Sequence, residues 1–135
     1  MIMWIIYFSV KPNIVKDPLE VTQQENKDIQ LACTVSAGSP KPLAFQWFFK
    51  PETGAEIAVT DRLRAMKTAF YNITKLTYKS AGVYRCEVDN GHDEKDEYQL
   101  TLNVLRKFEF IVIFLFCFLI CIYNKKKCCI STHNF

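Results

Sequence analysis

The chain has 135 residues, of which 23% are charged, and a formal net charge of +3. This length accommodates one domain of roughly 100 residues with a short segment at each end, and it excludes a second core. The positive excess lies in three lysines at 125–127, so the rest of the chain has no clustered cationic face and nucleic acid is excluded as a partner.

The first ten residues are predominantly apolar, as in the hydrophobic part of a secretory signal peptide. A basic start and a small-x-small cleavage site are both missing, and Ser9 is the only small residue in the segment. We predict that residues 1–10 are a short signal peptide, with an uncleaved apolar leader as the alternative. The folded domain is then expected over residues 11–106.

Beyond Lys11, apolar and polar residues alternate over short runs, a pattern typical of half-buried β-strands. The predicted strands cover residues 12–15, 19–22, 28–35, 45–50, 57–59, 71–76, 84–88 and 100–104. Pro18 splits the first strand because proline cannot donate to a sheet ladder. Residues 36–42, which contain glycine and proline, are predicted as a loop, and Asn90-Gly91 as a hairpin turn. The pattern predicts an all-β domain.

A tryptophan lies between two cysteines of this domain, and a tyrosine precedes the second cysteine by two residues. The segment from about residue 12 to 105 resembles an intermediate-type domain of the immunoglobulin superfamily. The residues that carry the resemblance are Cys33, Trp47, Gly82, Tyr84 and Cys86. It implies a two-sheet Greek-key sandwich in which Cys33 and Cys86 form a disulfide, Trp47 packs on it and the Tyr84 hydroxyl returns to the corner backbone. Such a bridge persists only in an oxidising compartment.

Two positions depart from the usual pattern of such domains. Ser80 stands where the family usually carries an aspartate that pairs with an arginine such as Arg62 or Arg64, so a weaker corner is expected. Asn26 stands where the family usually has glycine. Asparagine tolerates the left-handed backbone of such a turn, so this difference is expected to change little.

Residues 110–122 form an uninterrupted apolar run that precedes the lysines at 125–127. We predict a transmembrane helix over residues 107–123 and a short cytoplasmic tail over residues 124–135. Residues 108–123 reach roughly 24 Å at about 1.5 Å per residue, which is short of the ~30 Å hydrocarbon core, so a thin bilayer or snorkelling cations must make up the difference. The lysines favour the cytoplasmic side, which predicts a single-pass type I protein of the plasma membrane with its domain outside.

Three side chains are candidate modification sites. Asn72-Ile73-Thr74 is an N-glycosylation sequon, and the strand alternation directs Asn72 outward, so a glycan is predicted there unless it is an ordinary strand asparagine. Cys128 and Cys129 follow the lysines, where juxtamembrane cysteines are palmitoylated.

No catalytic or metal site is predicted. His92 and His133 have no nucleophile or base at a recognisable spacing, and the acidic residues near Asn90 lack the spacing of a calcium loop. We therefore expect no enzyme activity, no cofactor and no small-molecule substrate.

The outward residues of three neighbouring strands form a candidate protein contact around Phe48, Arg85 and Glu87. The favoured function is cell-surface recognition or adhesion, in which the single domain binds another protein. The alternative is a basigin-like accessory subunit that escorts or modulates a transporter, channel or receptor; Glu109, at the outer edge of the predicted span, is its weak support. A third hypothesis, a truncated form of a larger receptor, is suggested by the weak leader and the short span.

Overall fold

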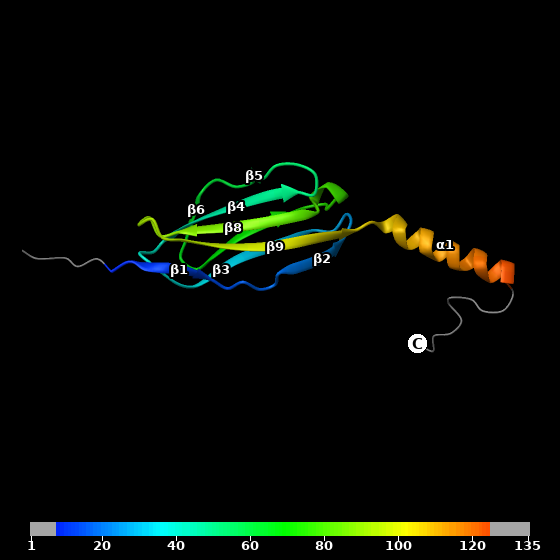
Figure 1. Cartoon of the computed structure of the whole chain (residues 1–135), viewed down its shortest axis with the longest axis horizontal. Coiled ribbons are helices and arrows are strands. Elements are labelled where there is room, and N and C mark those ends of the chain that lie inside the picture. Colours follow the sequence, from blue (N-terminus) through cyan, green and yellow to red (C-terminus); the bar gives the residue numbers. More distant parts are fainter. Residues whose placement is uncertain (1–7, 125–135) are drawn as a thin grey trace, which may run out of the picture.

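The computed structural model describes residues 8–124, apart from the side chains of residues 107–113 and 124. Its strands are β1 (Val10–Ile14), β2 (Glu20–Gln24), β3 (Ile29–Ser39), β4 (Leu43–Pro51), β5 (Ile57–Ala58), β6 (Leu63–Ala65), β7 (Thr68–Ile73), β8 (Gly82–Asp89) and β9 (Lys95–Leu105). A short 3-10 helix, η1 (Tyr78–Ser80), precedes β8, and helix α1 (Lys107–Asn124) follows β9. Figure 1 shows an elongated sandwich from whose end α1 extends.

The strands form two sheets that face each other. One has the order β1-β3-β7, and the other has the order β2-β9-β8-β4-β5, with β6 also paired to β4. The alternation of apolar residues explains this layering, because β8 buries every second side chain toward the core. The predicted all-β immunoglobulin-like sandwich is confirmed.

The first strand is split between the two sheets. Strand β1 pairs antiparallel with β3, whereas β2 pairs parallel with β9. The chain crosses from one sheet to the other near Pro18, whose carbonyl oxygen accepts a hydrogen bond from the buried Tyr98 hydroxyl. The predicted break at Pro18 is confirmed, and strand β1 begins at Val10, the last residue of the predicted leader segment.

The predicted loop over residues 36–42 is too long. Strand β3 continues to Ser39 because β1 lies beside it, with Asn13 opposite Ala37 and Val10 opposite Ser39. Gly38 fits inside this strand because its φ is 147° and a Cβ there would lie 2.9 Å from a methyl carbon of Leu43. Local composition predicted a loop, but pairing with a distant strand extended β3.

The core is centred on a disulfide between the sheets. Cys33 of β3 and Cys86 of β8 are bonded, with their Cα atoms 6.4 Å apart, and both are fully buried. Trp47 of β4 lies directly opposite Cys86 and has no exposed surface. The other fully buried or nearly buried large side chains include Leu31, Val35, Leu43, Phe45, Leu76, Tyr84, Val88, Tyr98, Leu100 and Leu102.

The corner before β8 is held by local hydrogen bonds. The Tyr84 hydroxyl donates to the Ser80 carbonyl oxygen at 2.7 Å, and the Ser80 Oγ accepts from the Thr77 backbone N–H at 3.2 Å. Burial raises the pKa of Tyr84, so the hydroxyl keeps its proton for this bond. Gly82 has a φ of 152°, and a side chain there would clash with the Lys50 carbonyl oxygen. Ser80 thus contributes a turn contact in place of the expected aspartate.

Asn26 has the left-handed backbone that the turn before β3 requires, with a φ of 67°.

At the other end of the domain, α1 covers the segment for which a membrane span was predicted. Within the part of the chain described, no helix is both long enough and apolar enough to cross a bilayer. Residues 1–7, Cys128 and Cys129 lie outside the described residues, so the predictions made for them stay predictions.

The disulfide closes a loop with a sequence separation of 53. Loss of the bridge in a Cys33→Ala/Cys86→Ala variant is expected to lower the free energy of unfolding by about 4 kcal/mol, because the unfolded chain regains the entropy of the open loop. Urea unfolding followed by tryptophan fluorescence measures this change. Reductant should lower the stability of the natural chain and leave the variant unchanged; an equal response of both would contradict the assignment.

Candidate functional site

The outer face of the six-stranded sheet carries the residues singled out as a protein contact. Phe48 of β4 lies opposite Arg85 of β8, which in turn lies opposite Gln99 of β9. Because the side chains of a strand alternate, these three point away from the core that Trp47 and Cys86 occupy. The structure therefore brings Phe48, Arg85 and Glu87 to one face, as the strand register requires.

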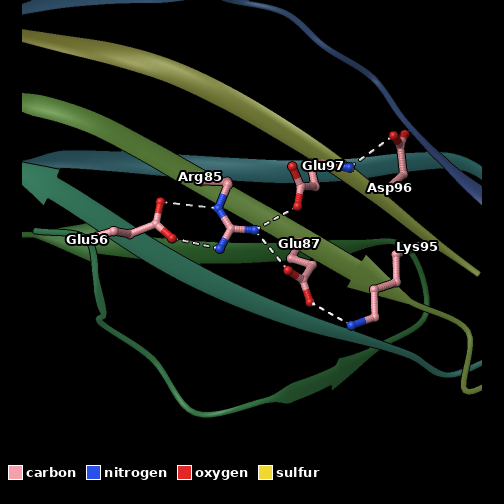
Figure 2. Close-up of polar contacts among 6 residues, drawn as sticks. All are labelled: Glu56, Arg85, Glu87, Lys95, Asp96 and Glu97. Carbon is pink, nitrogen blue, oxygen red and sulfur yellow. Dashed lines mark hydrogen bonds and ion pairs between the residues drawn. The ribbon is translucent and has the colours of Figure 1, made fainter. Parts of the chain in front are cut away.

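Arg85 is the centre of this face, and three carboxylates surround its guanidinium group (Figure 2). Glu56 accepts two hydrogen bonds, from Nη2 at 2.8 Å and from Nε at 3.2 Å. Nη1 donates to Glu87 at 2.8 Å and to Glu97 at 3.0 Å. Four donor contacts of a group that has five N–H bonds are thus satisfied, and the guanidinium orientation is fixed.

The guanidinium group of Arg85 stacks on the aromatic ring of Phe48. The Arg85 Cζ atom lies 4.1 Å from the ring centroid, within the range of a cation–π contact. The Arg85 side chain is only 13% exposed as a result, although it lies on the outer face of the sheet. We call Phe48, Glu56, Arg85, Glu87, Lys95 and Glu97 the Arg85 cluster.

The charges of the Arg85 cluster do not cancel. Glu87 also receives an ion pair from Lys95 at 3.4 Å, so two cations face three carboxylates and one negative charge remains. Hydrogen bonds from Arg85 hold the pKa of Glu56 and that of Glu87 below their ordinary values, against the opposing effect of burial. The same bonds, with Glu56 first, raise the pKa of Arg85. Glu56, Glu87 and Arg85 are therefore charged at neutral pH.

Sequence reasoning missed Glu56, Lys95 and Glu97 as members of the cluster. Glu56 comes from the segment before β5, where no periodic signal exists. Glu97 reaches the cluster because it lies opposite Glu87, and this register follows from a turn longer than the Asn90-Gly91 signal predicts. The hairpin predicted at Asn90-Gly91 is present, and it pairs Asp89 with Lys95 across a five-residue connection.

The physical reason for the longer turn is the Asn90 side chain. Asn90 is only 6% exposed, and its Nδ2 lies within hydrogen-bonding distance of the Val10 and Ser39 carbonyl oxygens and of Glu94. Its Oδ1 accepts from the His92 backbone N–H. Asn90 thus fastens the hairpin to β1 and β3 instead of serving as an exposed turn residue.

Asp96 has a similar fastening role on the neighbouring strand. Its Oδ2 accepts from the Ile14 backbone N–H at 2.8 Å and from Lys16 Nζ at 2.7 Å, while its Oδ1 accepts from the Glu97 backbone N–H. Burial opposes the charged form, but these bonds outweigh it and lower the pKa of Asp96. This carboxylate therefore connects β9 to β1.

The remaining candidate residues lie elsewhere. Trp47 and Tyr84 belong to the core, and Cys33 and Cys86 form the disulfide, so none of them contributes to a surface. Asn72 is exposed on the outer face of the three-stranded sheet, on the side of the sandwich opposite the Arg85 cluster.

A sandwich with a disulfide between its sheets, a buried tryptophan and a tyrosine hydrogen-bonded to the corner backbone defines an immunoglobulin-like domain. A family model described as an immunoglobulin domain matches residues 11–90, more than half of the chain. The chain therefore belongs to the immunoglobulin domain family.

Among curated proteins, the human leucine-rich repeats and immunoglobulin-like domains protein 1 is 27% identical over 109 residues. That match covers 73% of this chain and only 10% of the relative, so the chain spans about a tenth of the relative's length.

Solved structures share the fold. A single domain of titin, with 20% identity and a TM-score of 0.58, covers 73% of this chain and 98% of its own. A solved structure that concerns Dscam isoform specificity, with 22% identity and a TM-score of 0.58, covers 72% of this chain and 25% of its own.

Removal of the guanidinium should destabilise the domain, because three carboxylates lose the cation that lies between them. We expect Arg85→Met, which keeps the aliphatic contact with Phe48, to lower the free energy of unfolding by about 1–2 kcal/mol, a value reduced for the partial exposure of the carboxylates. Chemical unfolding at pH 7 measures this loss. Arg62→Met, at an exposed position before β6, is the matched control; an equal loss there would show that Arg85 has no special role.

The contribution of Arg85 to the free energy of unfolding should decrease at acid pH. Because the pKa values of Glu56 and Glu87 are lowered on folding, their stabilising effect is complete above the ordinary pKa of about 4.3 and is lost as the pH falls through the lowered values. The stability difference between the natural chain and Arg85→Met should be constant from pH 6 to 7 and shrink below about pH 4. A difference that persists at pH 2 would contradict this account.

Proposed function

We propose that this chain is a cell-surface recognition or adhesion protein and that the Arg85 cluster is its contact with another protein. The observation that carries the proposal is the Arg85 guanidinium, which is stacked on Phe48 and held by Glu56, Glu87 and Glu97 on an outer sheet face. The core lies on the other side of the sheet, so the packing of the described core residues does not depend on this arrangement.

The composition of the face favours a protein partner. Interfaces are enriched in arginine and aromatic residues at their centres and in exposed polar groups at their rims. Here Arg85 and Phe48 form the centre, while the side chains of Glu97 and Lys95, 56% and 48% exposed, form the rim. Because the hydrogen bonds already fix the rotamers, less side-chain entropy would be lost when a partner binds.

The position of the guanidinium bears on whether this face could hold a metal ion. The guanidinium occupies the position between the carboxylates that a metal ion would need, so the acidic residues serve to hold Arg85. Among the described residues, no group of three or more acidic, histidine or cysteine side chains could hold a metal.

The location follows from the bridge and the ends of the chain. The Cys33–Cys86 disulfide supports an extracellular domain, because such bonds persist in oxidising compartments. We propose that residues 107–123 of α1 are a single span of type I topology, that residues 124–135 are a cytoplasmic tail, and that Cys128 and Cys129 are palmitoylated. These proposals rest on the apolar run and the lysines at 125–127 in the sequence.

A glycan on Asn72 is proposed for the opposite side of the domain. Asn72 is exposed on β7, in the sheet that does not contain the Arg85 cluster. A bulky glycan there would cover the three-stranded sheet and leave the six-stranded sheet accessible. The two faces would then have different roles, with the Arg85 cluster on the face that remains bare.

The comparisons favour recognition in general terms. The Dscam structure concerns isoform specificity, and the human relative carries immunoglobulin-like domains by name. The basigin-like accessory role depended on Glu109, which lies in the part of α1 whose side chains are not described. No observation on the described residues favours that alternative.

Cross-linking on intact cells tests the proposed face. A photoreactive amino acid at Gln99, beside Arg85 and exposed, should give an adduct with another protein in the surface-labelled pool, because a bound partner would cover this position. The matched control is Lys11, which is exposed on β1 of the opposite sheet. The Gln99 adduct should be lost in a Glu97→Arg background, since the rim charge is reversed.

Two results would contradict the proposal. Failure of the expressed chain to label at the cell surface would remove the extracellular location. Equal adducts from Gln99 and Lys11, or an adduct insensitive to Glu97→Arg, would show that the Arg85 cluster is not the contact.

A further inference from the structure

Phe70 is an exposed aromatic residue on the outer face of the three-stranded sheet. Its surface is 51% exposed, and among the described residues it makes no ring stacking or cation–π contact. Its partner across the ladder is Ala32 of β3, whose methyl group is too small to cover a phenyl ring. One face of the Phe70 ring is therefore available to something outside the protein core.

Asn72, the first residue of the sequon, lies two positions after Phe70 on the same strand. Along β7 the inward positions are Ala69, Tyr71 and Ile73, so Phe70 and Asn72 both point outward. Residues two apart on a strand are separated by about 7 Å, which is about the width of one sugar ring. The sequence Phe70-Tyr71-Asn72-Ile73-Thr74 thus places an uncovered aromatic ring next to the attachment atom of a glycan.

We propose that Phe70 is the platform on which the first N-acetylglucosamine of an Asn72 glycan packs, an inference that rests on the glycan proposed above. On transfer from a lipid-linked donor, Asn72 Nδ2 loses a proton and bonds to C1 of the sugar, while the lipid diphosphate leaves. One face of the sugar ring presents only C–H bonds, and these are attracted to the electron-rich face of an aromatic ring. The sugar would cover apolar surface that the protein leaves exposed.

The surroundings of Asn72 suit the polar edge of the same sugar. Gln30 lies directly opposite Asn72 in the ladder and is exposed, so its amide is within reach of sugar hydroxyl or acetamido groups. A shallow hollow of about 330 Å³ adjoins the site, lined by Asp28, Ile29, Gln30, Asn72, Ile73 and Thr74. An apolar platform on one side and an amide on the other match the two kinds of surface that a pyranose ring offers.

Exposure of Phe70 alone would not indicate a ligand, because single exposed apolar residues are common on protein surfaces. Three features together support the platform: the uncovered ring, the small Ala32 opposite it, and the sequon two residues further along the same face. On the opposite sheet, Phe48 shows the contrasting case, because there the protein covers the ring with Arg85.

The test uses the full chain, made in glycosylating cells, and compares glycoforms of each variant. An endoglycosidase trims the glycan to its first sugar, and an amidase hydrolyses the side-chain amide, so that it removes the glycan entirely and leaves aspartate at position 72 in every variant. We expect the melting temperature of the trimmed form, relative to that of the sugar-free form, to be roughly 4 °C higher in the natural sequence and in Phe70→Tyr than in Phe70→Ser. Because each difference compares glycoforms of one variant, a general destabilisation by the substitution cancels.

Ile57→Ser is the matched control, since Ile57 is a similarly exposed apolar residue, 56% exposed, in the other sheet. It should keep the glycan-dependent shift in melting temperature. A glycan present on Asn72 with an unchanged shift in Phe70→Ser would overturn the platform and leave the glycan intact. The absence of any mobility change with the amidase, or with Asn72→Gln, would overturn both. Neither outcome affects the Gln99 cross-linking that tests the recognition face.

Discussion

The Cys33–Cys86 bond is the constraint on which the rest of the structure depends, because it fixes the separation of the two sheets at a single point in their middle. Trp47 fills the space beside the bond and is fully buried, although its indole N–H has no hydrogen-bond partner among the described residues. An unsatisfied buried donor costs free energy, and the burial of the large indole ring offsets that cost. Once this layer is packed, the alternation of each strand decides which residues reach an outer face.

The aromatic residues on the two outer faces have different surroundings. On the six-stranded sheet, Arg85 covers Phe48 and is itself held by carboxylates, so charge and ring form one rigid unit. On the three-stranded sheet, Phe70 lies opposite Ala32 and about half of its surface stays exposed. The difference arises from the cross-strand neighbour, since a long cation can fold over a ring whereas a methyl group cannot.

The sequence was sufficient for the features that depend on local pattern. The alternation around Leu31 and Cys33, the break at Pro18 and the left-handed Asn26 are all present in the structure. Features that depend on distant partners were not accessible. Strand β3 is longer than predicted because β1 pairs with its end. The hairpin register, and with it the place of Glu97, follows from the buried side chain of Asn90, and Glu56 joins the Arg85 cluster from a segment without periodicity.

The split first strand has a mechanical consequence. In Figure 1, β1 begins at one end of the sandwich, and β9 leaves from the other end into α1. Tension between the two ends of the domain would therefore act along the strands. The ladders of β1 with β3 and of β2 with β9 would be loaded in shear, so that many hydrogen bonds resist together instead of opening one after another. A domain built this way can transmit a pulling force while its outer faces keep their shape.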